Sequence, residues 1–124
     1  MIIGSGVDLC EVSRIKDAIA RHGRRFLERV YTGREIAYCE RKANLYERYA
    51  ARFAAKEAGM KALGTGWRGV AWRDFEVTNL PSGRPTLQFH GKAAEYAGKL
   101  GVANISLSIT HTSVQAMAIV ILEN

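Results

Sequence analysis

Glu57 and Lys61 are a carboxylate and an ammonium that lie one helical turn apart in the segment RFAAKEAGMKALGTG, residues 52–66. A spacing of four residues places two side chains on the same face of a helix. At an exposed surface such a pair would only stabilise the helix, by about 0.2–0.5 kcal/mol. Here apolar residues flank the pair on both sides, so the sequence predicts a narrow strip in which the carboxylate is half-buried. A half-buried charge needs a counter-ion or a metal.

Asp8 is a second carboxylate that could reach Glu57. The alternation of residues 2–9 is typical of a strand, and it places Asp8 at the strand end on the same face as two glycines. Packing explains such a carboxylate poorly, although it could simply precede and cap a helix. If the strand end crosses the helix, the two carboxylates would suit Mg²⁺, which binds one or two protein carboxylates together with water and substrate phosphates. Lys61 would then neutralise a phosphate oxygen.

Two further segments carry polar residues suited to a pocket. The strand-like segment 104–110 leads to His111 beside a short turn, which could form the lip of a binding site. A single histidine, however, is more often a hydrogen-bonded structural residue. The rigid turn PSGRP, residues 81–85, presents Arg84, which could grip a phosphate or be part of an ordinary hairpin connection.

The segments that position these residues belong to a chain whose length indicates a single domain, residues 1–124. Its fold class is α+β, with an antiparallel sheet and helices packed on one side. The first and last strands are nearly continuous apolar runs, which favours places in the middle of the sheet. The predicted strands are residues 2–9, 70–78, 86–89, 104–110 and 115–122.

The predicted helices are marked by capping and stop signals. Ser13 is expected to cap the first helix, which ends at residues 22–23. Thr32 and Glu35 form a capping-box pattern. The long helix, residues 45–63, carries the carboxylate strip and ends at two glycines. Shorter helical segments are expected over residues 26–30, 32–39 and 91–100.

Composition limits the function classes. The chain has 124 residues, 48% of them hydrophobic, and a net charge of +6. It has no apolar run of about 18 residues, so we expect no membrane span. The N-terminus has no basic stretch typical of a signal peptide, and Cys10 and Cys39 lack metal-ligand spacing, so we expect reduced thiols and a cytoplasmic location. The positive charge indicates nucleic acid, a phosphate-rich cofactor, an acidic protein or only a solvated surface.

Four blocks of the sequence resemble the bacterial holo-acyl-carrier-protein synthases, which are phosphopantetheinyl transferases. They are GVDLCEVSRI, RFAAKEAGMKALGTG, PSGRPTLQFHG and LSITHTSVQAMAIVILE, and they span the chain in the family's order. The resemblance implies a phosphopantetheinyl-transferase-like fold. It also implies a reaction in which the 4′-phosphopantetheine arm of coenzyme A is moved to a serine of apo acyl carrier protein, with release of adenosine 3′,5′-bisphosphate.

The resemblance implies roles for individual residues. Asp8 and Glu57 match the family's Mg²⁺ ligands, and Lys61 matches the lysine that contacts the pyrophosphate. Coenzyme A is expected at the boundary between two subunits of a homotrimer. The candidates for its nucleotide end are Arg52, Gly64, Arg84, Pro85, His111 and Thr112, in addition to Lys61. The candidates for the acidic carrier are Arg14, from the resemblance, and Arg21, Arg24 and Arg25, from charge alone.

The resemblance leaves the general base open among a metal-bound water, Lys61 and Glu57. Thr112 stands where other members carry an aspartate, so a carboxylate role there does not transfer to this chain.

Two other functions would require different features of the sequence. A nucleic-acid-binding module would interleave aromatic residues with its basic cluster, and only Phe26 and Tyr31 come close, so we expect no nucleic-acid partner. A non-catalytic adaptor for acyl carrier proteins would have no need for Asp8 and Glu57 together.

Overall fold

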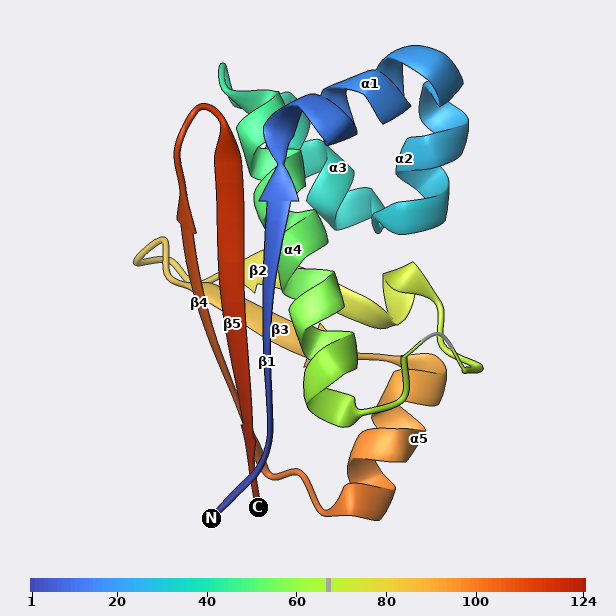
Figure 1. Ribbon diagram of the computed structural model, residues 1–124, viewed down its shortest axis with the longest axis vertical. Helices are drawn as coiled ribbons and strands as arrows, with labels where there is room; N and C mark the ends of the chain where they lie inside the picture. Colours follow the sequence, from blue (N-terminus) through green and yellow to red (C-terminus); the bar gives the residue numbers. More distant parts are fainter. Residues whose placement is uncertain (67) are drawn as a thin grey trace.

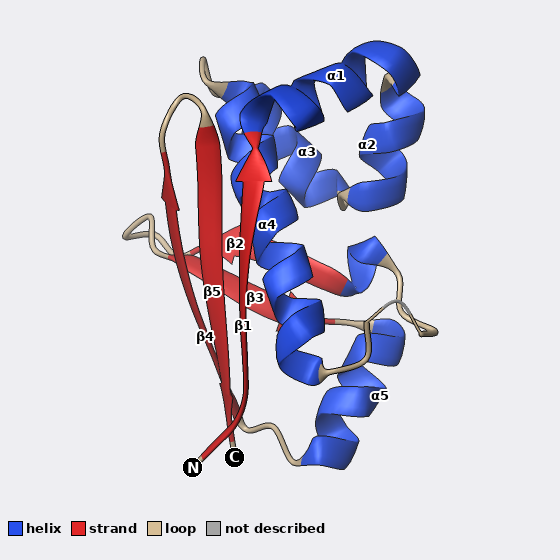
Figure 2. Cartoon of the chain, in the orientation of Figure 1, coloured by secondary structure: helices blue, strands red, loops and turns tan. Residues whose placement is uncertain are grey.

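The computed structural model describes residues 1–66 and 68–124 and confirms the α+β class. Figures 1 and 2 show three long strands on one side of a central helix, α4, with the other helices gathered at its two ends. In chain order the elements are β1 (Ile2–Glu11), α1 (Val12–His22), α2 (Arg24–Val30), α3 (Gly33–Glu40), α4 (Leu45–Leu63), a 3-10 turn η1 (Trp72–Asp74), β2 (Phe75–Asn79), β3 (Pro85–Phe89), α5 (Gly91–Leu100), β4 (Asn104–His111) and β5 (Gln115–Glu123).

The strands form two antiparallel sheets rather than one. A three-stranded sheet has the order β1-β5-β4, and β2 pairs with β3 separately. Of the two apolar strands predicted for the middle of the sheet, β5 is central, but β1 lies at an edge of the sheet of this chain. The two sheets pack on different sides of α4, and Figure 1 shows β2 and β3 crossing α4 at an angle to the long strands.

Two glycines set the distance between β1 and α4. A Cβ atom at Gly4 would lie 2.2 Å from the carbonyl oxygen of Ala62, and one at Gly6 would lie 2.0 Å from that of Ala58. Real Cβ atoms do not approach so closely, so only glycine lets the strand lie directly on the helix backbone. This contact places Asp8, on the same face of β1, beside α4.

The core encloses α4 almost completely. From Tyr49 to Leu63 every residue of the helix is buried except Glu57, which is half-buried, and Lys61, which is exposed. The predicted strip between two packed faces is therefore confirmed. Gly64 ends the helix in the left-handed conformation, with φ of 75°, as its sequence predicts.

The opposite face of the three-stranded sheet is uncovered in the single chain and carries apolar residues on β1 and β5, whereas β4 contributes Ser106, Ser108 and Thr110. Val7 and Leu9 on β1 and Met117 and Ile119 on β5 are all exposed. Among the described residues, no helix is long and apolar enough to cross a membrane.

Two local predictions were wrong. The first helix begins at Val12, with Glu11 at its N-cap position and no side-chain cap, so Ser13 lies inside the helix. Residues 70–78 form a strand only from Phe75, because the 3-10 turn η1 precedes it. The capping box of Thr32 and Glu35 is confirmed.

Candidate active site

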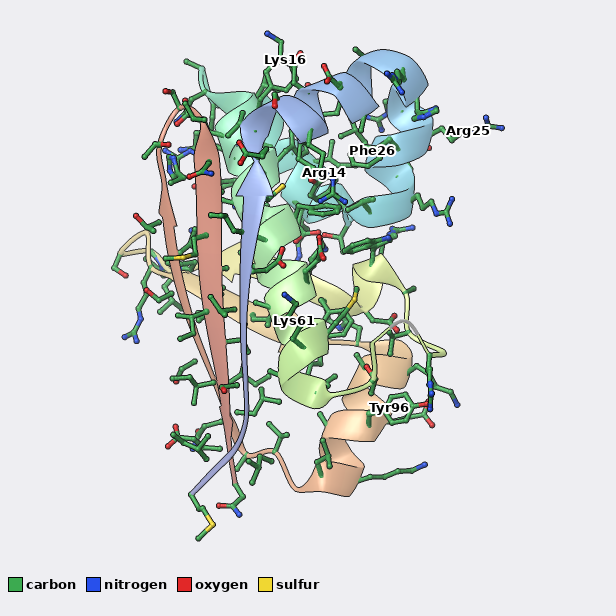
Figure 3. The ribbon with its side chains drawn as sticks, in the orientation of Figure 1. Arg14, Lys16, Arg25, Phe26, Lys61 and Tyr96 are labelled. Atoms are coloured by element: carbon green, nitrogen blue, oxygen red, sulfur yellow. The ribbon has the colours of Figure 1, made fainter. Side chains whose placement is uncertain are left out.

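Asp8 and Lys61 form an ion pair between β1 and α4. The Lys61 ammonium lies 3.0 Å from the Asp8 Oδ1 atom and donates a second hydrogen bond of 3.0 Å to the Val7 carbonyl oxygen. Figure 3 shows Lys61 pointing from α4 toward β1. The Asp8 side chain is 12% exposed and the Lys61 side chain 56% exposed, so the carboxylate is held by the fold while the ammonium reaches it from solvent.

Glu57 lies one turn before Lys61, and its electrostatic environment differs from that of Asp8. Burial raises the pKa of its carboxyl group, and the negative charge of Asp8 raises it further, while Arg14 and Lys61 oppose these effects. Among the residues that the structure describes, Glu57 accepts no hydrogen bond. We therefore consider Glu57 a carboxylate held beside a second carboxylate with its ligand-binding oxygens free.

This donor set fits Mg²⁺ better than a metal that prefers an all-protein cage. No group of three or more His, Cys, Asp or Glu suited to a metal occurs in the described part of the chain. Mg²⁺ needs only one or two protein carboxylates, because waters and substrate phosphates complete its coordination. Asp8 and Glu57 provide that number.

Arg14 belongs to the basic surface of α1 and α2 and interacts electrostatically with Glu57. Its guanidinium carbon lies 5.3 Å from the centre of the Phe53 ring, and its charge lowers the pKa of Glu57. The hollow beside it is lined by Arg14 and Arg21, and a neighbouring hollow by Arg25 with Phe26. Figure 3 shows Arg14 directed inward and Arg25 directed away from the molecule.

Arg24 differs from the other predicted carrier-binding arginines. It forms an exposed ion pair of 3.2 Å with Glu28, one turn further along α2, and it lines a separate hollow on that helix. Of the four arginines, Arg14, Arg21 and Arg25 therefore border neighbouring hollows, while Arg24 lies apart from them.

Arg52 is placed by contacts within its own chain. It is 4% exposed, donates a 2.8 Å hydrogen bond to the Asn79 Oδ1 atom, and stacks 4.0 Å from the centre of the Tyr38 ring. Asn79 in turn donates to the carbonyl oxygen of Gly83, in the turn between β2 and β3. Arg52 is thus linked to that turn, where Arg84 is exposed and Pro85 is half-buried.

His111 pairs with the first turn of α4. Its Nδ1 atom lies 3.1 Å from the Glu47 Oε1 atom, and both side chains are a quarter exposed. Thr112 organises the turn that follows, because its hydroxyl oxygen accepts hydrogen bonds of 3.1 Å from the backbone N–H groups of Val114 and Gln115. His111 and Thr112 both line a hollow beside Leu9.

The predicted site residues fall into two separate groups in one chain. The first, which we call the carboxylate site, consists of Asp8, Glu57 and Lys61, with Gly64 one turn beyond. The second, which we call the nucleotide group, consists of Arg52, Arg84, Pro85, His111 and Thr112. Glu47, the partner of His111, precedes Glu57 by 10 residues and Lys61 by 14 along α4, or about 15 and 21 Å. Figure 1 also shows the β2–β3 turn projecting beyond β4, on the far side of the sheet from β1.

Sequence reasoning missed two charged residues of α4. Lys56, adjacent to Glu57, is fully buried and bonded to Glu35, and its position within an alanine-rich helix was the available signal. No local sequence pattern indicated a role for Glu47, because its partner His111 lies 64 residues away.

Comparisons with known proteins agree on one relationship. The family model described as the 4′-phosphopantetheinyl transferase superfamily matches residues 4–119. A holo-[acyl-carrier-protein] synthase of Solibacter usitatus is 69% identical over 125 residues, which cover the whole of both chains. The crystal structure of the holo-[acyl-carrier-protein] synthase from Neisseria meningitidis aligns over the whole of both chains with a TM-score of 0.90 and 32% identity. That of a holo-(acyl-carrier-protein) synthase from Bacillus anthracis, in complex with CoA (3′,5′-ADP), covers 98% of this chain and 96% of its own, with a TM-score of 0.80 and 35% identity.

Proposed function

Because the chain belongs to the holo-[acyl-carrier-protein] synthases of the 4′-phosphopantetheinyl transferase superfamily, we propose that it transfers the 4′-phosphopantetheine arm of coenzyme A to a serine hydroxyl of an apo acyl carrier protein. The second product is adenosine 3′,5′-bisphosphate. The observation that carries this proposal is the half-buried Glu57 carboxylate, which has no hydrogen-bond donor among the described residues and lies beside Asp8 and Lys61.

The carboxylate site is suited to phosphoryl-type transfer, in which catalysis rests on positioning and charge neutralisation. Asp8 and Glu57 would hold Mg²⁺, which, when bound, neutralises charge that develops on the pyrophosphate oxygens. The Lys61 side chain is long and exposed, so its ammonium can reach a phosphate oxygen without movement of the backbone. The close contact of Gly4 and Gly6 with α4 keeps the two carboxylates at a fixed separation.

The separation of the two groups of residues supports a site shared between subunits. In a single chain the nucleotide group lies apart from the carboxylate site, and in the proposed assembly a neighbouring chain supplies one of the two groups. The outer face of the three-stranded sheet, with the apolar residues Val7, Leu9, Met117 and Ile119 exposed, is the surface that such an assembly would bury. A homotrimer arranged around this face is therefore part of the proposal.

The carrier is expected to dock on α1 and α2. Acyl carrier proteins are acidic, and Arg14, Arg21 and Arg25 border neighbouring hollows on these helices. Arg14 also faces Glu57, so a carrier bound there would bring its serine toward the carboxylate site. The two cysteines are buried and unpaired, which fits a reducing compartment, and we place the enzyme in the cytoplasm.

A mass measurement tests this function directly. The protein is incubated with coenzyme A, apo acyl carrier protein and Mg²⁺, and the carrier is weighed by mass spectrometry. The carrier should gain the mass of phosphopantetheine, and the gain should disappear with EDTA.

The matched variants are Glu57→Gln, which should lower the rate by about 10³-fold, or about 4 kcal/mol, and Glu95→Gln. Glu95 is an exposed residue of α5 whose only described ion pair, with Lys92, is 3.9 Å long, so its substitution should leave the rate unchanged. Unmodified carrier in the wild-type reaction would refute the proposed activity, and near-normal turnover in Glu57→Gln would remove Glu57 from the site.

A further inference from the structure

The Lys61 ammonium is hydrogen-bonded to one oxygen of Asp8, a carboxylate that would also hold a bridging cation. It lies 3.0 Å from the Asp8 Oδ1 atom and 3.0 Å from the Val7 carbonyl oxygen. Charge-assisted hydrogen bonds of this kind are stronger than neutral ones. Lys61 is therefore the cation bound to this site in the folded chain.

The two carboxylates of the site differ in their hydrogen bonding. Asp8 has Lys61 as its counter-ion, whereas Glu57, one turn away, has no hydrogen-bond donor among the described residues. An ammonium and a divalent cation on the same carboxylate would repel each other at close range. A cation that joins Asp8 to Glu57 would therefore weaken the Lys61–Asp8 ion pair and favour the lysine moving away.

The two partners of the ion pair differ in freedom. Asp8 is 12% exposed and lies on a strand whose glycines contact the backbone of α4. Lys61 is 56% exposed and carries four flexible methylene groups, so its head can swing into solvent. Displacement therefore requires a rotamer change of one lysine and no movement of the fold.

We propose that Lys61 competes with the divalent cation for Asp8, and that its displacement by the cation releases its ammonium toward the pyrophosphate of coenzyme A. This inference rests on the proposed function, because it assumes that Asp8 and Glu57 bind the metal. It gives Lys61 two successive counter-ions: the Asp8 carboxylate before the site is assembled and a phosphate oxygen afterwards.

Competition between Lys61 and the metal would couple metal binding to coenzyme A binding. A cation bound without coenzyme A would displace Lys61 and leave the lysine without a counter-ion. When coenzyme A binds as well, its pyrophosphate accepts the released ammonium. Metal and coenzyme A should therefore strengthen each other's binding, and by linkage the effect is the same in both directions. Part of that coupling depends on Lys61.

The test measures Mn²⁺ binding to the protein alone, from the electron paramagnetic resonance signal of the free hydrated ion. Removal of the competing ammonium in Lys61→Met should tighten Mn²⁺ binding about fivefold. The matched control is Arg14→Met, which removes an equal charge that faces Glu57 but is not hydrogen-bonded to Asp8. That variant should change Mn²⁺ affinity by less than about twofold.

Further variants separate failure of this inference from failure of the proposed function. If Asp8→Asn and Glu57→Gln bind Mn²⁺ as tightly as the wild type, the metal site itself is wrong. If both variants lose Mn²⁺ while Lys61→Met binds it no more tightly than the wild type, the metal site holds and the competition is refuted. An equal gain in Arg14→Met would also refute it, since general charge would then explain the effect.

Coenzyme A supplies a second readout. Mn²⁺ affinity is measured for the wild type and Lys61→Met with and without saturating coenzyme A. Coenzyme A should tighten Mn²⁺ binding more in the wild type than in the variant. The same tightening in both proteins would refute the release of Lys61 toward the pyrophosphate.

Discussion

Helix α4 carries two lysines, of which one is buried and the other exposed. Lys56 is fully buried, and its ammonium bonds to the Glu35 Oε1 atom at 2.7 Å and to the carbonyl oxygens of Trp72 and Phe75. The other Glu35 oxygen accepts a 2.8 Å hydrogen bond from the backbone N–H of Val77. Lys61, five residues further along the helix, is exposed and forms its ion pair with Asp8. The Asp8 charge also acts on Glu57, which accepts no hydrogen bond from the described residues.

The two ion pairs differ in how fully their hydrogen-bonding groups are occupied. At Lys56 both partners have their hydrogen-bonding groups occupied, and the pair joins α4 to α3 and to the segment leading into β2. Burial lowers the Lys56 pKa, and the Glu35 charge opposes that effect. At the carboxylate site, burial and Asp8 instead raise the Glu57 pKa. The first pair is complete without a ligand, whereas the second has oxygens available to one.

Lys56→Met should produce the largest change in stability. It leaves Glu35 charged and buried without its counter-ion, and the loss of one partner from a buried pair costs about 3–5 kcal/mol in the free energy of unfolding. Lys61→Met, the same substitution at the exposed position, should cost less than about 1 kcal/mol. Urea unfolding of both variants makes this comparison. Equal losses would show that the two pairs are not different in kind.

Glu76 extends the comparison to pH. Hydrogen bonds from Arg34, Thr32 and His90 outweigh burial and lower its pKa from 4.5 to about 2. Because the pKa in the folded chain lies below that in the unfolded chain, ionised Glu76 stabilises the fold above about pH 4.5. That stability is lost as the pH falls toward 2. The contribution at neutral pH is less than about 3 kcal/mol, because solvent screens the interactions with the exposed Arg34 and His90 side chains.

The measurement for Glu76 is urea unfolding at pH 7 and at pH 2.5. The wild type should lose more stability between these values than Glu76→Gln, which lacks the titrating group. If both proteins lose the same amount, other groups account for the acid sensitivity.

Gly6→Ala tests the contact that places Asp8 beside α4. The added Cβ would lie 2.0 Å from the Ala58 carbonyl oxygen, so strand and helix must move apart. We expect a loss of about 1–3 kcal/mol in stability and a turnover lower by about 100-fold, because the two carboxylates separate. Gly33→Ala is the matched control, since nothing lies within 4 Å of its added Cβ. Normal turnover in Gly6→Ala would show that the separation of the carboxylates is not critical.

Glu57→Gln should have the smallest effect on stability, and in the opposite direction. The Glu57 pKa is raised in the folded chain, so its ionised form disfavours folding at pH values above that pKa. Removal of the charge should raise the free energy of unfolding at pH 8 by less than about 1 kcal/mol and have no such benefit at pH 4. A clear loss of stability at pH 8 would mean that the Glu57 carboxylate is satisfied by the fold.

Local sequence signals predicted the residues of the carboxylate site and the elements that carry them. The bounds of the long helix, its glycine stop and the Thr32–Glu35 capping box follow from interactions within a few residues, which the sequence contains. The alternation of β1 likewise predicted that Asp8 faces the side kept bare by glycines. The family match confirms the resemblance that the motifs indicated.

Tertiary structure alone decided which partner each of these faces meets. Periodicity indicates which side chains face the interior, but their bonding partners come from elsewhere in the chain. These partners are Glu35 for Lys56, Glu47 for His111 and Asn79 for Arg52. It also decided that β1 lies at a sheet edge and that the nucleotide group lies apart from the carboxylate site. These features depend on contacts between residues distant in sequence, whose geometry is set by the packing of whole elements.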